Sequence, residues 1–186
     1  MNYILQYWER IESNKELVSK RVYKQYKKLV SEIKSPGQFI FDEEKANRPI
    51  QFIESFCKHS KGEWAGKPVK LELFQKAYIS ALFGFIDKET GFRRYRESLF
   101  LVARKNGKTS MMAAVALYML IADGEAGAEV YSTATKRDQA RILFDETHNM
   151  VKQSPYLSKH LKKRKSDIYF PLTLSKIQPL GKNSNT

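Results

Sequence analysis

The residues with the clearest chemical potential are the run Arg104-Lys105-Asn106-Gly107-Lys108-Thr109. A phosphate-binding loop needs a glycine that lets backbone N–H groups approach the phosphates, a lysine that reaches them, and a hydroxyl that helps to hold Mg²⁺. Gly107, Lys108 and Thr109 supply these groups in that order. A helix that begins here would add the partial positive charge of its N-terminus. The run therefore predicts a loop that binds phosphate and Mg²⁺.

The segments on both sides of this loop must position it. Residues 98–103 form a short continuous apolar run, which is typical of a strand buried on both faces of a parallel sheet. Residues 111–122 form a longer apolar run, which favours a buried helix. One departure weakens the motif, because the full pattern has a glycine where this chain has Val102. An ordinary basic turn between strand and helix is the alternative.

Hydrophobic periodicity predicts the other elements. Helices are expected over residues 1–34, 49–60, 71–85 and 135–152, with Thr135 capping the last of these. Strands are expected over 128–133 and 168–177, the second interrupted by Pro171, and a turn over 87–91. The inward face of 71–85 is expected to carry Leu71, Phe74, Tyr78, Ala81, Leu82 and Phe85. The alternation of strands and helices predicts an α/β fold, with a parallel sheet flanked by helices.

Positive charge dominates the 186 residues, since 33 Lys and Arg against 20 Asp and Glu give a formal charge of +13. Such an excess favours a polyanionic partner, either nucleic acid or an anionic membrane surface. Lysines crowd residues 1–35, which are expected to form a basic helical arm that binds DNA or a partner, or is simply solvated. The single cysteine, Cys57, excludes a disulfide within these residues, and the three histidines are too scattered for a metal site.

An ordered series of short motifs resembles the N-terminal ATPase part of the large subunit of tailed-phage terminases. The resemblance covers residues 36–186, which we expect to form a truncated P-loop ATPase domain. In that family the loop usually reads Arg-Lys-Asn-Gly-Lys-Ser/Thr without the first glycine. The motifs lie at residues 61–68, 71–75, 83–85, 90–93, 103–109, 126–131, 134–140 and 153–155.

The resemblance implies a role for each loop residue. Lys108 would contact the β- and γ-phosphates of ATP, Thr109 would bind Mg²⁺, and Lys105, Asn106 and Gly107 would complete the cradle. Arg104 would act as a charge-stabilising finger, or else simply face solvent. Upstream, Gln75 would read the adenine edge, since an amide both donates and accepts hydrogen bonds. Without the resemblance, Gln75 is a polar residue at the border of a helix.

The resemblance also implies partners and a place of action. The parent protein would use ATP to package double-stranded phage DNA into a prohead, together with the terminase small subunit and the portal protein. It would work as a homo-oligomer in the cytoplasm of the bacterial host of a phage or prophage, with no membrane partner. A C-terminal nuclease domain of the family would be absent from these residues.

The acidic pair that ends the second essential strand of such ATPases, the Walker B box, has only two imitators here. Asp42 and Glu43 follow an apolar run, but they precede the phosphate loop. Asp145 and Glu146 would serve a helicase-like ATPase if residues 142–148 formed a strand, yet the periodicity favours a helix. In the family the acidic box comes later than residue 186. We therefore expect little ATP turnover from this chain, and a non-catalytic fragment that binds nucleotide or DNA stays an alternative.

Overall fold

The computed structural model describes residues 1–182, and the chain divides into two compact units. Unit 1 comprises residues 1–51 and 71–101, and unit 2 comprises residues 52–70 and 102–186. The last four residues of the expected 36–186 domain lie outside the described residues. Both units are therefore assembled from segments that are separate in the sequence, and the division does not follow the expected boundary at residue 35.

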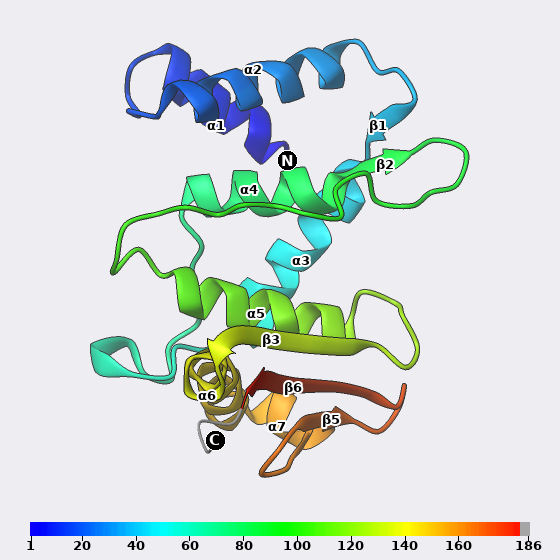
Figure 1. The fold of residues 1–186 in the computed structure, drawn as a ribbon. Helices are drawn as coiled ribbons and strands as arrows, with labels where there is room; N and C mark the ends of the chain where they lie inside the picture. Colours follow the sequence, from blue (N-terminus) through cyan, green and yellow to red (C-terminus); the bar gives the residue numbers. More distant parts are fainter. Residues whose placement is uncertain (183–186) are drawn as a thin grey trace. The chain divides into compact units, whose positions relative to one another are not determined.

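Unit 1 is mainly helical (Figure 1). Its elements are α1 (Tyr3–Glu12), α2 (Lys20–Lys34), β1 (Phe39–Phe41), the first part of α3 (Glu43–Phe56), α4 (Leu73–Gly84) and β2 (Phe85–Asp87). The strands β1 and β2 pair antiparallel, and the carboxylate of Asp87 accepts the amides of Glu89 and Thr90 at 2.9 and 3.0 Å. These hydrogen bonds form the expected turn over 87–91 and lower the pKa of Asp87.

The core of unit 1 shows that the N-terminal segment is not a single helix. Residues 13–19 separate α1 from α2, and Asn14 adopts a left-handed φ of 55° in this break. The two helices pack with Ala77 of α4 and Phe85 of β2 around one cluster. Residues 1–35 thus share a core with residues that the sequence assigned to the next domain. The other members of the cluster are Ile4, Tyr7, Trp8, Ile11, Tyr26, Leu29 and Val30.

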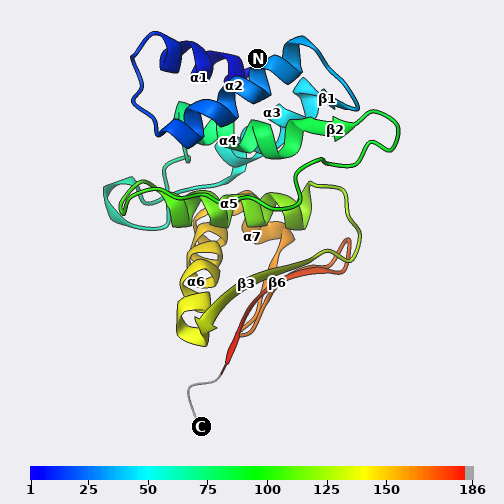
Figure 2. The ribbon, with the colours of Figure 1, turned by 45° about the horizontal axis from the view of Figure 1, so that its top comes forward.

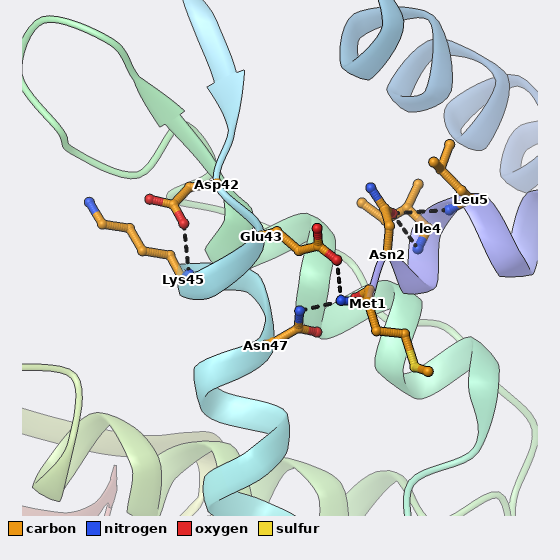
Figure 3. A network of polar contacts seen from close by, with 8 residues as sticks. All are labelled: Met1, Asn2, Ile4, Leu5, Asp42, Glu43, Lys45 and Asn47. Carbon is orange, nitrogen blue, oxygen red and sulfur yellow. Dashed lines mark hydrogen bonds and ion pairs between the residues drawn. The ribbon is translucent and has the colours of Figure 1, made fainter.

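Polar side chains cap or contact the N-terminal ends of α1 and α3 in unit 1 (Figure 3). The Asn2 side chain accepts two first-turn amides of α1, both at 3.1 Å. Asp42 accepts a first-turn amide of α3 at 2.9 Å, and the Glu43 carboxylate pairs with the amino group of Met1. Asn47 donates to the Met1 carbonyl at 3.0 Å. The acids that follow β1 therefore stabilise a helix start, where negative charge is favourable.

Unit 2 contains a mixed sheet rather than the expected parallel one. The strand order is β3-β6-β5-β4, and of the strand pairs described here only β3 with β6 is parallel (Figure 1). The expected strand over 168–177 is two strands joined by a tight turn, because Pro171 cannot donate a ladder hydrogen bond. The strands are β3 (Glu129–Lys136), β4 (Lys162–Lys163), β5 (Ile168–Phe170) and β6 (Ser175–Lys182).

The helices of unit 2 carry its core. They are the end of α3, α5 (Lys108–Ile121), α6 (Arg137–Gln153) and α7 (Pro155–His160), with a short 3₁₀ turn over Gly62–Trp64. The expected helices at 111–122 and 135–152 are confirmed, although Thr135 lies in β3 and Lys136 is the residue before α6. Helix α6 packs against α5, β3 and β6 (Figure 2). Across residues 1–182, no helix is both long and apolar enough to cross a bilayer.

Residues 98–103 do not form the expected buried strand. No described strand pairs with them, and Leu99 and Leu101 are each 85% exposed. Between them, Phe100 packs against Phe74 and Tyr78 of α4, with ring centroids 6.4 and 4.5 Å apart. An apolar run is buried on both faces only where neighbouring strands and covering helices are present. This segment is instead extended, with one face packed and the other open.

The inward face of α4 also differs from the expected one. Phe74, Tyr78, Ala81 and Leu82 are only half-buried, whereas Gln75, Ala77, Ile79, Ser80 and Phe83 are buried. A helix that is apolar over most of its surface has no unique stripe, so periodicity does not identify the side that packs.

Candidate functional site

The backbone of residues 104–109 turns sharply before α5. Lys105 and Gly107 have left-handed φ angles of 68° and 67°. Gly107 adopts this conformation freely, whereas Lys105 does so at a cost of about 1–2 kcal/mol. The side-chain amide of Asn106 donates to the carbonyls of Ala103 and Arg104, each at 3.3 Å. These contacts close the loop upon itself immediately before the helix.

The helix start presents groups that suit an anion. Gly107 is the residue before α5, and Lys108 and Thr109 are its first two residues. The first N–H groups of an α-helix have no partner within the helix, and they carry its positive end. All six residues from Arg104 to Thr109 are exposed. The rest of α5 is anchored by buried residues such as Met111 and Leu117, so this positive end is held on a packed element.

A buried carboxylate lies next to this helix start. Glu146 of α6 is only 7% exposed, and its Oε1 accepts hydrogen bonds from the hydroxyls of Ser60 and Ser110 at 2.8 and 3.1 Å. The ammonium of Lys61 lies 3.8 Å from the other carboxylate oxygen, Oε2. We call these four residues the Glu146 network. It ties the first turn of α5 to α6 and to the loop before the 3₁₀ turn.

The Glu146 network was not foreseen from the sequence. Ser60 and Lys61 lie far from Ser110 along the chain, and their shared partner emerges only in the folded unit. The single signal in the sequence was Ser110 itself, which directly follows the Gly-Lys-Thr of the loop.

Neither acidic pair that imitates the Walker B box has the position that this box requires, at the end of a strand beside the phosphate loop. Residues 142–148 lie within α6, so the strand that a helicase-like ATPase would need is excluded here. Asp145 is exposed while Glu146 is buried in its network, because adjacent residues of a helix face different sides. The other pair follows β1 in unit 1, where Asp42 caps α3.

The remaining candidate residues are located but their roles stay predictions. Gln75 is buried in α4, and its side-chain oxygen accepts the amide of Glu72 at 3.0 Å, which caps that helix. Gln75 belongs to unit 1, whereas the loop belongs to unit 2. Arg104 is exposed on the loop. Within residues 1–182, no group of three His, Cys, Asp or Glu side chains is arranged to hold a metal ion.

Comparison with known proteins defines the class. Residues 73–186, more than half of the chain, match the family described as terminase large subunit, ATPase domain. The chain therefore belongs to this family, which confirms the resemblance seen in the sequence.

Two individual proteins are similar to this chain. The large terminase subunit of Enterobacteria phage HK97 is 34% identical over 114 residues, which are 61% of this chain and 21% of that protein. The crystal structure of the HK97 bacteriophage large terminase matches with a TM-score of 0.62 and 28% identity, over 74% of this chain and 27% of that one. The chain thus spans about a fifth to a quarter of the length of these relatives.

Proposed function

We propose that this chain binds Mg-ATP as part of the motor of a terminase large subunit. The proposal rests above all on one observation. In a member of the terminase ATPase family, the exposed Gly107-Lys108-Thr109 sequence stands at the start of a buried helix. Backbone amides, an ammonium group and a hydroxyl all belong to this helix start, and these are the groups that a triphosphate with its metal ion requires.

Each residue has a distinct role in this proposal. Lys108 contacts the β- and γ-phosphates, Thr109 binds Mg²⁺, and the amides of Lys105, Asn106 and Gly107 surround the phosphates. Arg104 stabilises the charge that develops on the transferred phosphoryl group. Gln75 reads the adenine. Mg²⁺, when bound beside Thr109, would supply positive charge that neutralises the phosphates.

In the whole protein, ATP binding would be coupled to the packaging of double-stranded phage DNA into a prohead. The proposed partners are the terminase small subunit, the portal protein and further copies of the motor. From residues 1–182 alone we expect little turnover. Asp42 caps α3, and the Oε1 atom of Glu146 accepts the hydroxyls of Ser60 and Ser110, so both acids already have structural roles.

The decisive experiment measures Mg-ATP binding by calorimetry for the wild type and for Lys108→Ala. Removal of the ammonium should weaken binding by at least about tenfold, which corresponds to about 1.4 kcal/mol. Lys70→Ala, which removes an exposed lysine elsewhere in unit 2, serves as the matched control and should bind like the wild type. Equal affinity for Lys108→Ala and the wild type would show that the loop does not bind the nucleotide.

A further inference from the structure

The densest positive charge of unit 2 lies where α7 leads into the β4–β5 hairpin. Within residues 159–165 the chain carries five lysine or arginine side chains and no acid. All five are exposed. They are Lys159, Lys162, Lys163, Arg164 and Lys165. The phosphate loop uses none of them, so this cluster needs its own explanation.

The backbone of the hairpin is well held. Leu161, which joins α7 to β4, is buried, and β4 pairs antiparallel with β5. The amide of Arg164 donates to the carbonyl of Asp167 at 2.8 Å. The Arg164 guanidinium lies 4.4 Å from the centre of the Tyr169 ring and 3.7 Å from the Asp167 carboxylate. Arg164 therefore stabilises the hairpin, while the lysines around it remain exposed.

A lysine of α6 adds to the same positive field. The pKa of His148 is lowered by burial first and then by the charges of Lys163 and Lys152, while Asp145 opposes the shift. Charges from the end of α6 and from β4 therefore act on one place. We define the hairpin surface as Lys152, Lys159, Lys162, Lys163 and Lys165.

Edge protection explains only part of this charge. β4 is the outermost strand of its sheet, and lysines on an edge strand discourage pairing with other chains. That reason applies to Lys162 and Lys163. It does not account for Lys152 and Lys159, which lie on helices, or for Lys165, which follows the strand. Like charges gathered in this way repel one another, and a bound polyanion would relieve that repulsion.

We propose that the hairpin surface binds the phosphate backbone of duplex DNA. The choice of duplex DNA over another polyanion rests on the proposed function. Lysine ammonium groups act as point charges on phosphates and carry little base preference, so the contact would be insensitive to sequence.

The test compares two charge-matched variants of the full chain. The hairpin variant carries Lys162→Glu, Lys163→Glu and Lys165→Glu. The control carries Lys20→Glu, Lys24→Glu and Lys27→Glu on α2, where all three lysines are also exposed. Each variant changes the net charge by −6, from +13 to +7. Binding to a labelled duplex of mixed sequence is followed by fluorescence anisotropy over a series of salt concentrations.

The hairpin variant should bind the duplex at least about tenfold more weakly than the wild type. Its plot of log K against log salt should be less steep by about 0.9 for each DNA phosphate that the variant no longer neutralises. The control variant should be weakened clearly less. An equal weakening in both variants, or a larger one in the control, overturns the proposal. So does tighter wild-type binding to vesicles of anionic lipid than to the duplex.

Two further measurements keep the result interpretable. Circular dichroism checks that each variant folds. If a glutamate variant does not fold, the same three lysines are changed to glutamine instead. Calorimetry with Mg-ATP should give wild-type affinity for the hairpin variant. Unchanged ATP affinity in Lys108→Ala would overturn the proposed function but leave the DNA measurement valid. Unchanged DNA affinity in the hairpin variant would overturn the DNA proposal but leave the ATP measurement valid.

Discussion

At the scale of single residues, Glu146 has a structural role that differs from the catalytic one its sequence context indicates. In the sequence, Asp145 and Glu146 imitate the acidic pair of a helicase-like ATPase. In the structure they belong to α6, and Glu146 accepts the hydroxyls of Ser60 and Ser110. A buried carboxylate is tolerated only where donors compensate for its loss of water. Glu146 thus positions the first turn of α5 through Ser110, the residue that follows Thr109.

We therefore predict different results for the two acids. Glu146→Ala leaves both serine hydroxyls without their acceptor, which should destabilise the protein by about 1–3 kcal/mol. It should also weaken Mg-ATP binding, because the start of α5 is less firmly held. Asp145→Asn, an exposed neighbour, should change neither quantity. Urea unfolding and calorimetry provide the measurements.

Phosphate release under steady-state conditions adds a separate check on the same variants. Turnover should stay near background for the wild type, Glu146→Ala and Asp145→Asn alike. Strong wild-type turnover that disappears in Asp145→Asn would show that this exposed carboxylate takes part in catalysis.

At the scale of elements, the junction of β1, α3 and α4 is packed without spare room. A Cβ placed on Gly84, the last residue of α4, would lie 2.5 Å from the Phe41 ring and 2.7 Å from the Ala46 side chain. Such contacts are far inside van der Waals distance, so the absence of a side chain here is required by packing. The conformation of Gly84 is an ordinary one, with no positive φ.

Gly84→Ala should accordingly destabilise the protein by about 1–3 kcal/mol, the usual cost of overpacking. Gly37→Ala is the matched control, because a Cβ at Gly37 meets nothing within 4 Å. That control should be neutral or slightly stabilising, since alanine restricts the unfolded chain. Thermal unfolding of the two variants gives the comparison. Similar unfolding midpoints for both would show that Phe41 and Ala46 can shift to accommodate the added methyl group.

At the scale of the whole molecule, strong positive charge coexists with exposed apolar side chains. Leu99 and Leu101 lie on the open face of an extended segment that no described strand pairs with. Unpaired backbone next to apolar side chains is a common origin of association between chains. The net charge of +13 opposes such association at low salt, and this repulsion is screened as salt increases.

The chain should therefore self-associate as ionic strength increases. The double variant Leu99→Ser with Leu101→Ser should remain monomeric to higher protein concentration, as measured by sedimentation velocity. Leu17→Ser, which alters another highly exposed leucine, is the control and should behave like the wild type. Identical association of the double variant and the wild type would locate the associating surface elsewhere.

Features that depend on neighbours along the chain could be predicted from the amino-acid order alone. Helix α5 forms where a continuous apolar run predicts it, and α6 forms where periodicity predicts it, because helical hydrogen bonds are local. The turn after Asp87 follows from local side-chain hydrogen bonds. The loop at 104–109 is recognisable because its chemistry lies in consecutive residues. The same ordered motifs were sufficient to indicate the family.

Features that depend on residues far apart required the folded chain. Whether residues 98–103 pair as a strand depends on partners that no local pattern reveals, and among the strands of residues 1–182 only β3 and β6 run parallel. The burial of Gln75 depends on which side of an apolar helix is packed. The partners of Glu146 come from residues 60, 61 and 110, which folding alone brings together. Strand pairing and the burial of charge are properties of the assembled unit, so a sequence pattern predicts them only in part.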